Sequence, residues 1–160
     1  MKRKIKAIIA WTVVISLMIG IFCFSSQTAD ISSKTSRGFS HALFSLMPWY
    51  NALGEIEQSQ VLENFQFVMR KTAHYFVYAL LGASMYLALK ETINKKGMYI
   101  YAFFISALYA VSDEIHQGFV PGRSCEVRDV FLDSLGVLTG ILVVMLIYNL
   151  LTIKGKKNII

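Results

Sequence analysis

Ionisable side chains are concentrated in the stretch from Asp113 to Asp133, DEIHQGFVPGRSCEVRDVFLD, which separates two apolar segments. It holds five of the ten acidic residues, together with two arginines and a histidine. A short connector between apolar helices does not need so many ionisable groups, and such groups are expensive at membrane depth. Carboxylates and histidine can transfer protons, and the planar fork of arginine suits carboxylate or phosphate. We therefore expect a functional site here.

A second set of polar side chains lies in the first half of the apolar segment Val68–Leu89. It comprises Arg70, Lys71, His74 and Tyr78. In a helix, residues four apart share a face, so His74 and Tyr78 should point the same way. This set is a candidate partner for the acidic stretch, although the two are distant in sequence.

The spacing of two acids and two glycines predicts an inward-facing stripe on the last apolar segment. Asp129, Asp133, Gly136 and Gly140 fall at i, i+4, i+7 and i+11, which is one face of a helix. The glycines form a GxxxG motif, which allows close approach of a neighbouring helix. The acids should then point into the bundle. A homodimer through Gly136 and Gly140 is compatible with the same motif.

The spacing of residues at the end of the third apolar segment and in the loop after it predicts where their side chains point. Asp113 and Gln117 share a helical face, whereas Glu114 lies roughly 100° away around the axis. Pro121-Gly122 is typical of a turn, because proline fixes φ and glycine tolerates positive φ. The turn should present Arg123 at the apex of the loop.

Four apolar segments must position these groups, and mean hydropathy is +0.51. The third segment is uncharged for only 15 residues, to Ser112, whereas crossing the hydrocarbon takes roughly 20. Its helix must therefore continue through both carboxylates. The basic start followed by 18 uncharged residues favours an uncleaved helix over a secretory signal. The predicted spans are Ala7–Phe24, Val68–Leu89, Met98 through Gln117, and Ser134–Leu151.

Between the first two spans, Ser25–Gln66 is the longest polar connection. Phe39, Leu43, Leu46 and Met47 fall at i, i+4, i+7 and i+8, an amphipathic stripe. This pattern predicts an interfacial helix on the membrane surface. A loop with a few apolar contacts is the alternative.

The distribution of charge predicts the orientation of the chain. If the N-terminus is cytoplasmic, the cytoplasmic segments Met1–Lys6, Lys90–Gly97 and Ile153–Ile160 hold ten Lys and Arg and one acid. The opposite side holds six Lys and Arg and nine acids, so the positive-inside pattern is strong. The fold class is an all-α integral membrane protein, a single domain over residues 1–160 with four transmembrane helices and both termini cytoplasmic. The net charge of +6 flanks apolar segments, which argues against nucleic acid as the partner.

Structural interpretations compete with the functional ones. Arg123 or Arg128 could simply neutralise nearby acids, and His74 could be a helix-packing donor bonded to a carboxylate. Cys125 as a nucleophile would need a nearby base, such as His74 or His116. Histidine and carboxylate are suitable ligands for a divalent metal, and His74, His116, Asp113, Glu114 and Asp129 could supply them. No HExxH motif or paired-cysteine spacing supports such a site, so no metal and no cofactor are predicted.

The polar segments resemble the VanZ-like family of small bacterial membrane proteins. The matching pieces are RKTAHYFVYALLG (Arg70–Gly82), DEIHQGFVPGRSCEVRDVFLDSLGVLTG (Asp113–Gly140) and FSSQ (Phe24–Gln27). The resemblance implies a multi-pass protein of the bacterial plasma membrane, and the founding member of the family is associated with teicoplanin resistance. The family's polar positions correspond here to Arg70, Lys71, His74, Tyr78, Asp113, Glu114, Gln117, Arg123 and Asp129. Members often have Asn where this chain has Asp133.

Three functions are compatible with these residues. In the first, an extracytoplasmic polar pocket binds or modifies the headgroup of a membrane lipid or lipid-linked wall precursor and lowers glycopeptide susceptibility. In the second, the chain is a membrane-embedded enzyme on a lipid-phosphate substrate, with Glu114, Asp113 or His74 as acid or base. A proton-coupled transporter is less favoured, because the ionisable groups lie at one side and a relay would lack its second half.

Overall fold

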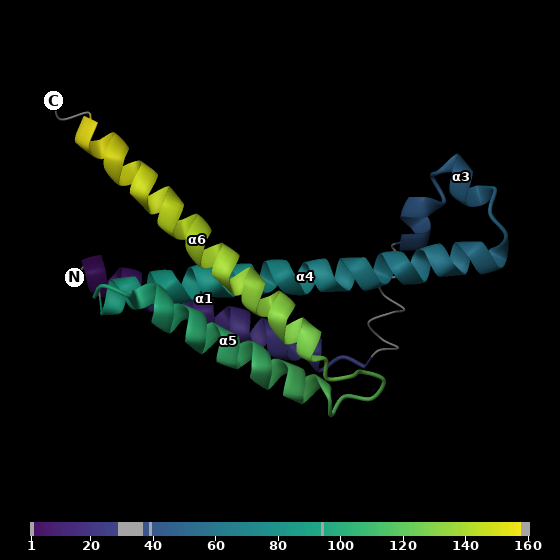
Figure 1. Cartoon of the computed structure of the whole chain (residues 1–160), viewed down its shortest axis with the longest axis horizontal. Helices are drawn as coiled ribbons and strands as arrows, with labels where there is room; N and C mark the ends of the chain where they lie inside the picture. Colours follow the sequence, from purple (N-terminus) through teal and green to yellow (C-terminus); the bar gives the residue numbers. More distant parts are fainter. Residues whose placement is uncertain (1, 29–36, 39, 94, 158–160) are drawn as a thin grey trace.

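The computed structural model describes residues 2–28, 37–38, 40–93 and 95–157. Its helices include α1 (Lys2–Ser25), α3 (Pro48–Asn51), α4 (Glu55–Thr92), α5 (Met98–Gln117) and α6 (Val127–Lys157), and these described residues include no strand (Figure 1). Four of the helices, α1, α4, α5 and α6, are long and apolar enough to cross a membrane. The predicted all-α class with four candidate membrane-spanning helices is confirmed. The side on which the termini lie and the interfacial helix stay predictions.

The four long helices run alternately up and down. At one end, Arg3 Nε of α1 donates to the carbonyl of Glu91, 3.0 Å away near the end of α4. At the other end, Ser25 Oγ of α1 donates to Asp113 Oδ2 of α5 at 2.8 Å. Figure 1 shows the N-terminus beside the α4–α5 turn and the α5–α6 connection at the opposite end. The polar segments singled out in the sequence therefore meet at that opposite end.

Helix α4 is much longer than predicted. The second span was expected over Val68–Leu89, but α4 has 38 residues and starts at Glu55. At 1.5 Å per residue it is about 57 Å long, nearly twice the hydrocarbon thickness, and it projects past its neighbours (Figure 1). The prediction that the polar connection extends to Gln66 was wrong. Residues 55–66 are rich in Glu and Gln, which are unfavourable in lipid but good helix formers.

The segment before α4 folds back onto this projecting part. The rings of Phe44 and Phe65 are 5.0 Å apart, and Gln58 Nε2 donates to the carbonyls of Tyr50 and Leu53, each at 3.1 Å. Of the predicted amphipathic stripe, Phe39 lies outside the described residues and Leu46 is 80% exposed. The segment thus packs through its aromatic residues.

The contact between α4 and α6 depends on three glycines. A Cβ at Gly136 would overlap the carbonyl of Tyr75, and one at Gly140 would overlap the carbonyl of Ala79, both on α4. On α4, Gly82 meets the backbone of Val137 in the same way. The predicted close approach at the GxxxG motif is therefore made within the chain, between α4 and α6. The homodimer stays a prediction.

Helix α5 ends as the length argument predicted, at Gln117. Asp113 is 3% exposed and Glu114 is 1% exposed, so both carboxylates belong to the helical bundle. Helix α6 begins at Val127, which places Asp129 and Asp133 in its first two turns. The loop of nine residues between Gln117 and Val127 joins these two acidic helix ends.

Candidate functional site

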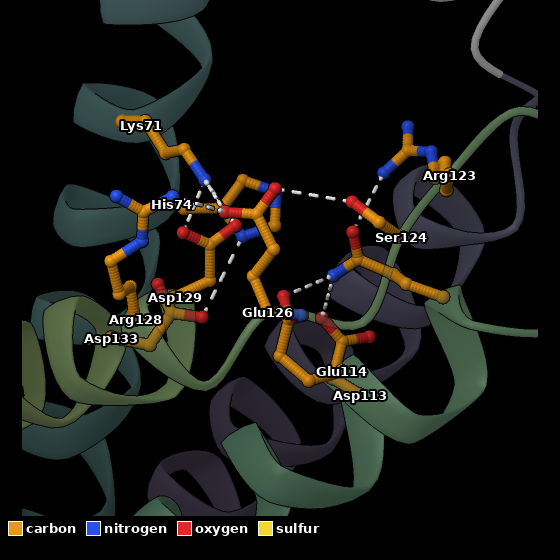
Figure 2. Close-up of polar contacts among 11 residues, drawn as sticks. Lys71, His74, Asp113, Glu114, Arg123, Ser124, Glu126, Arg128, Asp129 and Asp133 are labelled. Atoms are coloured by element: carbon orange, nitrogen blue, oxygen red, sulfur yellow. Dashed lines mark hydrogen bonds and ion pairs between the residues drawn. The ribbon is translucent and has the colours of Figure 1, made fainter.

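Polar side chains from α4, α5, α6 and the α5–α6 loop converge at one end of the bundle (Figure 2). Ser25 of α1 joins them through its hydrogen bond to Asp113. The loop turns at Gly122, whose φ of 79° lies in the left-handed region that glycine adopts readily. The amide of Arg123 closes this turn by donating to the carbonyl of Val120 at 3.1 Å. The predicted Pro121-Gly122 turn is confirmed, and Arg123 follows it directly.

The inner layer of the site is a set of hydrogen-bonded carboxylates at the end of α5. Gln117 Nε2 donates to Asp113 Oδ2 at 3.1 Å and to Glu114 Oε1 at 3.0 Å. The other oxygen of Glu114 accepts the backbone N–H of Glu126 at 3.1 Å. Ser25 supplies a further donor to Asp113 from α1. Buried carboxylates require such partners, and these bonds also fix the loop and α1 onto α5.

Arg123 does not neutralise an acid. Its NH1 group donates to Gln117 Oε1 at 3.1 Å and its NH2 group to the carbonyl of Phe24 at 3.4 Å. Arg128 does form an ion pair with Glu126, at 3.6 Å, but its side chain is 90% exposed. Of the two arginines weighed for neutralisation, only Arg128 has that role. Among the residues that the structure describes, no carboxylate lies within ion-pair distance of Arg123 or Arg70.

These two arginines are close enough to influence each other. Burial and, to a smaller extent, the neighbouring Arg70 cation lower the pKa of the Arg123 guanidinium, while Asp113 and Glu114 act in the opposite direction. A guanidinium keeps its charge at any physiological pH. Arg70 is exposed on α4 and Arg123 is half-buried in the loop. Two like charges from different elements thus face the same space.

Lys71 connects α4 to α6. Its Nζ forms an ion pair with both carboxylate oxygens of Asp129 and lies 3.7 Å from Glu126 Oε2. The ammonium also lies over the Phe67 ring, 5.2 Å from the centroid. The Ser124 hydroxyl, which donates to Glu126 at 3.1 Å, and then Lys71 hold the pKa of Glu126 below its ordinary value. The charge of Lys71 is therefore matched within the protein.

Beneath this layer, His74 faces a fully buried acid. His74 Nδ1 lies 3.7 Å from Asp133 Oδ2, and Asp133 is 0% exposed. Neither oxygen of Asp133 accepts a hydrogen bond within the described part of the chain. The stripe of α6 predicted Asp133 to point inward, which is confirmed. A carboxylate partner for His74 was one of the alternatives, but its identity could not be predicted, because it depends on how α4 crosses α6.

Two cavities open beside these groups. The smaller, of about 80 Å³, is lined by charged and polar groups, and we call it the polar cavity. The larger, of about 650 Å³, lies between α1 and α4, and we call it the α1–α4 cavity. Arg70, His74 and Arg123 line both. The polar cavity is further lined by Lys71, Gln117, Gly122, Ser124, Glu126 and Asp129.

The structure divides the predicted site residues into two groups. Arg70, Lys71, His74, Gln117, Arg123 and Asp129 all line the polar cavity. Asp113, Glu114 and Tyr78 line neither cavity, and Tyr78 is 0% exposed, with its ring 6.4 Å from that of His74.

Two further residues weighed in the sequence analysis, His116 and Cys125, line neither cavity. His116 stacks on Phe22 at 4.4 Å, its Nε2 is 3.0 Å from Ser26 Oγ, and Cys125 is exposed. No three His, Cys, Asp or Glu side chains are grouped as metal ligands within the described ranges. Ser124 was not predicted from the sequence, and Glu126 was considered only as an acid that Arg123 or Arg128 could neutralise. Phe24 and Ser25 belong to the FSSQ motif, which was the available signal for them.

Comparisons with known proteins identify the family of the chain. No curated protein and no solved structure matches it. A sequence model of the VanZ/LLP1 family matches residues 10–148, which extends from α1 to α6 and includes every residue of the polar cavity. Because this match covers most of the 160 residues, the chain belongs to the VanZ/LLP1 family.

Proposed function

We propose that the chain binds the anionic headgroup of a membrane lipid or lipid-linked wall precursor. The observation that carries the proposal is the pair Arg70 and Arg123, which line both cavities without a carboxylate partner among the described residues. Guanidinium groups bind phosphate through parallel N–H donors. A phosphate between the two arginines would also remove their mutual repulsion.

The pairing of the other charges supports an anion over a cation as the ligand. The site has several acids, but Asp129 and Glu126 are paired with Lys71 and Arg128. Asp113 and Glu114 accept hydrogen bonds from within the protein and line neither cavity. Glu63, which lines the α1–α4 cavity, is paired with Arg37 at 3.5 Å. The charges on the cavity walls that have no ion-pair partner in the described part of the chain are therefore those of Arg70 and Arg123, and both are positive.

We place this site at the outer face of a bacterial plasma membrane. The segments at the opposite end of the bundle, with the N-terminus and the α4–α5 turn, carry the excess of Lys and Arg expected of cytoplasmic segments. A site at the outer face could contact lipid-linked wall precursors on the side of the membrane where glycopeptides bind them. If the protein bound or modified such a precursor, less teicoplanin would bind to the cell.

The test compares two arginines that are five residues apart. The purified chain in dodecyl maltoside micelles is titrated with dodecyl phosphate, and bound ligand is counted by native mass spectrometry. Arg123→Gln should weaken binding about tenfold to a hundredfold, because hydrogen bonds between charged groups are worth about 1.5–3 kcal/mol. Arg128→Gln is the control, because Arg128 is 90% exposed and lines neither cavity.

The two results have different consequences. Equal affinity of the parent and Arg123→Gln would overturn the headgroup proposal. If binding depends on Arg123, teicoplanin bound to intact cells that express the parent or Arg123→Gln then measures the effect on the antibiotic. Equal teicoplanin binding would contradict the resistance role alone.

An enzyme on a lipid-phosphate substrate is the second candidate, and His74 is the observation in its favour. His74 lines both cavities and lies 3.7 Å from buried Asp133, an acid able to orient an imidazole base. Glu114 and Asp113 are placed less well for this role, because neither reaches a cavity. If the chain is a hydrolase, it releases inorganic phosphate from dodecyl phosphate, and His74→Gln loses that release while still binding the lipid.

A further inference from the structure

The α1–α4 cavity extends well beyond the arginines. Its volume of about 650 Å³ is typical of a site for a small organic ligand. Most of its wall area is apolar, although four polar side chains besides Arg70, His74 and Arg123 also line it: Ser25, Gln27, Glu63 and Gln66. The apolar lining residues are Ile21, Phe24, Phe67, Met69, Ala73 and Val77. A headgroup alone would leave this apolar surface uncovered.

The cavity is polar and cationic on one side and apolar towards the interior of the bundle. Along α4, Val77 lies seven residues from Arg70, about 10 Å further from the loop end. Ile21 occupies the matching depth on α1, four residues before Ser25. Arg123 faces the cavity from the loop. This order matches an amphiphile whose anionic head is level with the arginines and whose chain extends towards Ile21 and Val77.

Two donors at this cavity have no acceptor in the described part of the protein. They are Gln66 Nε2 and Arg123 Nε, both buried, and both belong to residues of the cavity wall. Leaving a buried donor without a partner destabilises a protein. Phosphate or ester oxygens of a ligand in the cavity could supply the missing acceptors. An entirely apolar occupant would not.

We propose that the α1–α4 cavity binds a hydrocarbon chain of the same phosphate-bearing lipid whose headgroup contacts Arg70 and Arg123. This inference rests on the proposed function and adds the chain to it. The protein then recognises phosphate and chain together, so it selects a lipid phosphate over a soluble phosphate ester. The charge complementarity at one side and the apolar wall at the other favour a lipid over a peptide as the occupant.

The test fills the cavity without touching the arginines. Ala73→Phe places a ring in the cavity wall, whereas Thr72→Phe adds a ring to an exposed neighbouring position that lines neither cavity. Dodecyl phosphate and ethyl phosphate are titrated in dodecyl maltoside micelles. Ala73→Phe should weaken dodecyl phosphate binding about tenfold, the equivalent of one overpacked contact, and Thr72→Phe should change it less than about twofold. Neither variant should change the weaker binding of ethyl phosphate.

The outcomes separate this inference from the headgroup proposal. If dodecyl phosphate binding depends on Arg123 but is equal in Ala73→Phe and Thr72→Phe, the chain is not in the cavity and only the headgroup proposal stands. If Arg123→Gln leaves dodecyl phosphate binding unchanged, the headgroup proposal fails, and the inference that rests on it fails as well.

A second measurement does not depend on the folding of the filled variant. A dodecyl phosphate with a diazirine at the end of its chain is bound to the parent protein and irradiated. Mass spectrometry of the digested protein should place the label on α1 near Ile21 and on α4 near Val77. Label confined to α5 and α6, or spread evenly over the exposed apolar surface, would overturn the inference.

Discussion

At the scale of single residues, the site depends on which charges are paired. The sequence predicted that Arg70, Lys71, His74, Asp113, Glu114, Arg123 and Asp129 would come together, and the structure brings them to one end of the bundle. Their pairing could not be predicted, because it depends on side-chain reach across helix crossings. Arg123 and Arg128 both lie within three residues of Glu126 in the sequence, yet Arg123 bonds to Gln117 and the Phe24 carbonyl.

Glu126 gives the site a defined response to pH. Its folded-state pKa is held below the ordinary value of 4.5 by Ser124 and Lys71, so the unfolded chain binds a proton at a higher pH than the folded chain does. The stabilisation is therefore complete above about pH 4.5 and is lost as pH falls through the lower folded-state pKa. Because Glu126 is 34% exposed, the effect should be below about 1 kcal/mol.

Thermal unfolding of the parent and Glu126→Gln, measured in detergent from pH 7 to pH 3.5, tests this response. The parent should be slightly more stable at pH 7, and the difference should shrink towards pH 3.5. Ser124→Ala, which removes the hydroxyl donor, should show a smaller loss on acidification than the parent. A difference that is constant with pH, or that grows in acid, would contradict the assignment.

At the scale of helices, the crossing of α4 and α6 determines the positions of Lys71 and His74. Gly136 and Gly140 bring the α6 backbone against Tyr75 and Ala79. On α4, Tyr75 is adjacent to His74 and about one turn from Lys71. The GxxxG spacing predicted this close approach, and the need for about 20 residues to cross a membrane predicted the end of α5. The start of α4 was not predictable from hydropathy, because helix propensity continues through the polar residues 55–66.

Replacing Gly140 with Ala should separate α4 from α6. The added Cβ meets the Ala79 backbone, which cannot move without shifting the helix, so we expect a loss of about 2–3 kcal/mol. Gly20→Ala on α1 is the matched control, because nothing lies within 4 Å of a Cβ there. Stability is measured by thermal unfolding in detergent, and dodecyl phosphate binding should weaken with it. Equal stability of the two variants would show that the crossing tolerates a wider spacing.

At the scale of the whole molecule, alternating helices bring distant segments to one end. Because α1 ends where α5 ends, Ser25 meets Asp113 across 88 positions of sequence. Because α6 starts where α5 stops, a short loop suffices to place Arg123 beside Arg70. An even number of spans also puts both termini at the other end, where Lys and Arg are concentrated. The alternating topology therefore explains two features together: the concentration of Lys and Arg at one end of the bundle, and the position of the site at the other end.

This topology, together with the charge bias, predicts which side of the membrane each loop occupies. Cys125 is exposed in the α5–α6 loop, so a membrane-impermeant maleimide should label it in intact cells that express Cys23→Ser. Lys95→Cys, in the exposed α4–α5 turn of a chain that also carries Cys23→Ser and Cys125→Ser, should be labelled only after permeabilisation. The reverse pattern would place the arginines at the cytoplasmic face. Lipid phosphate binding could then still occur, but contact with wall precursors outside the cell, and with it the proposed effect on teicoplanin, would be excluded.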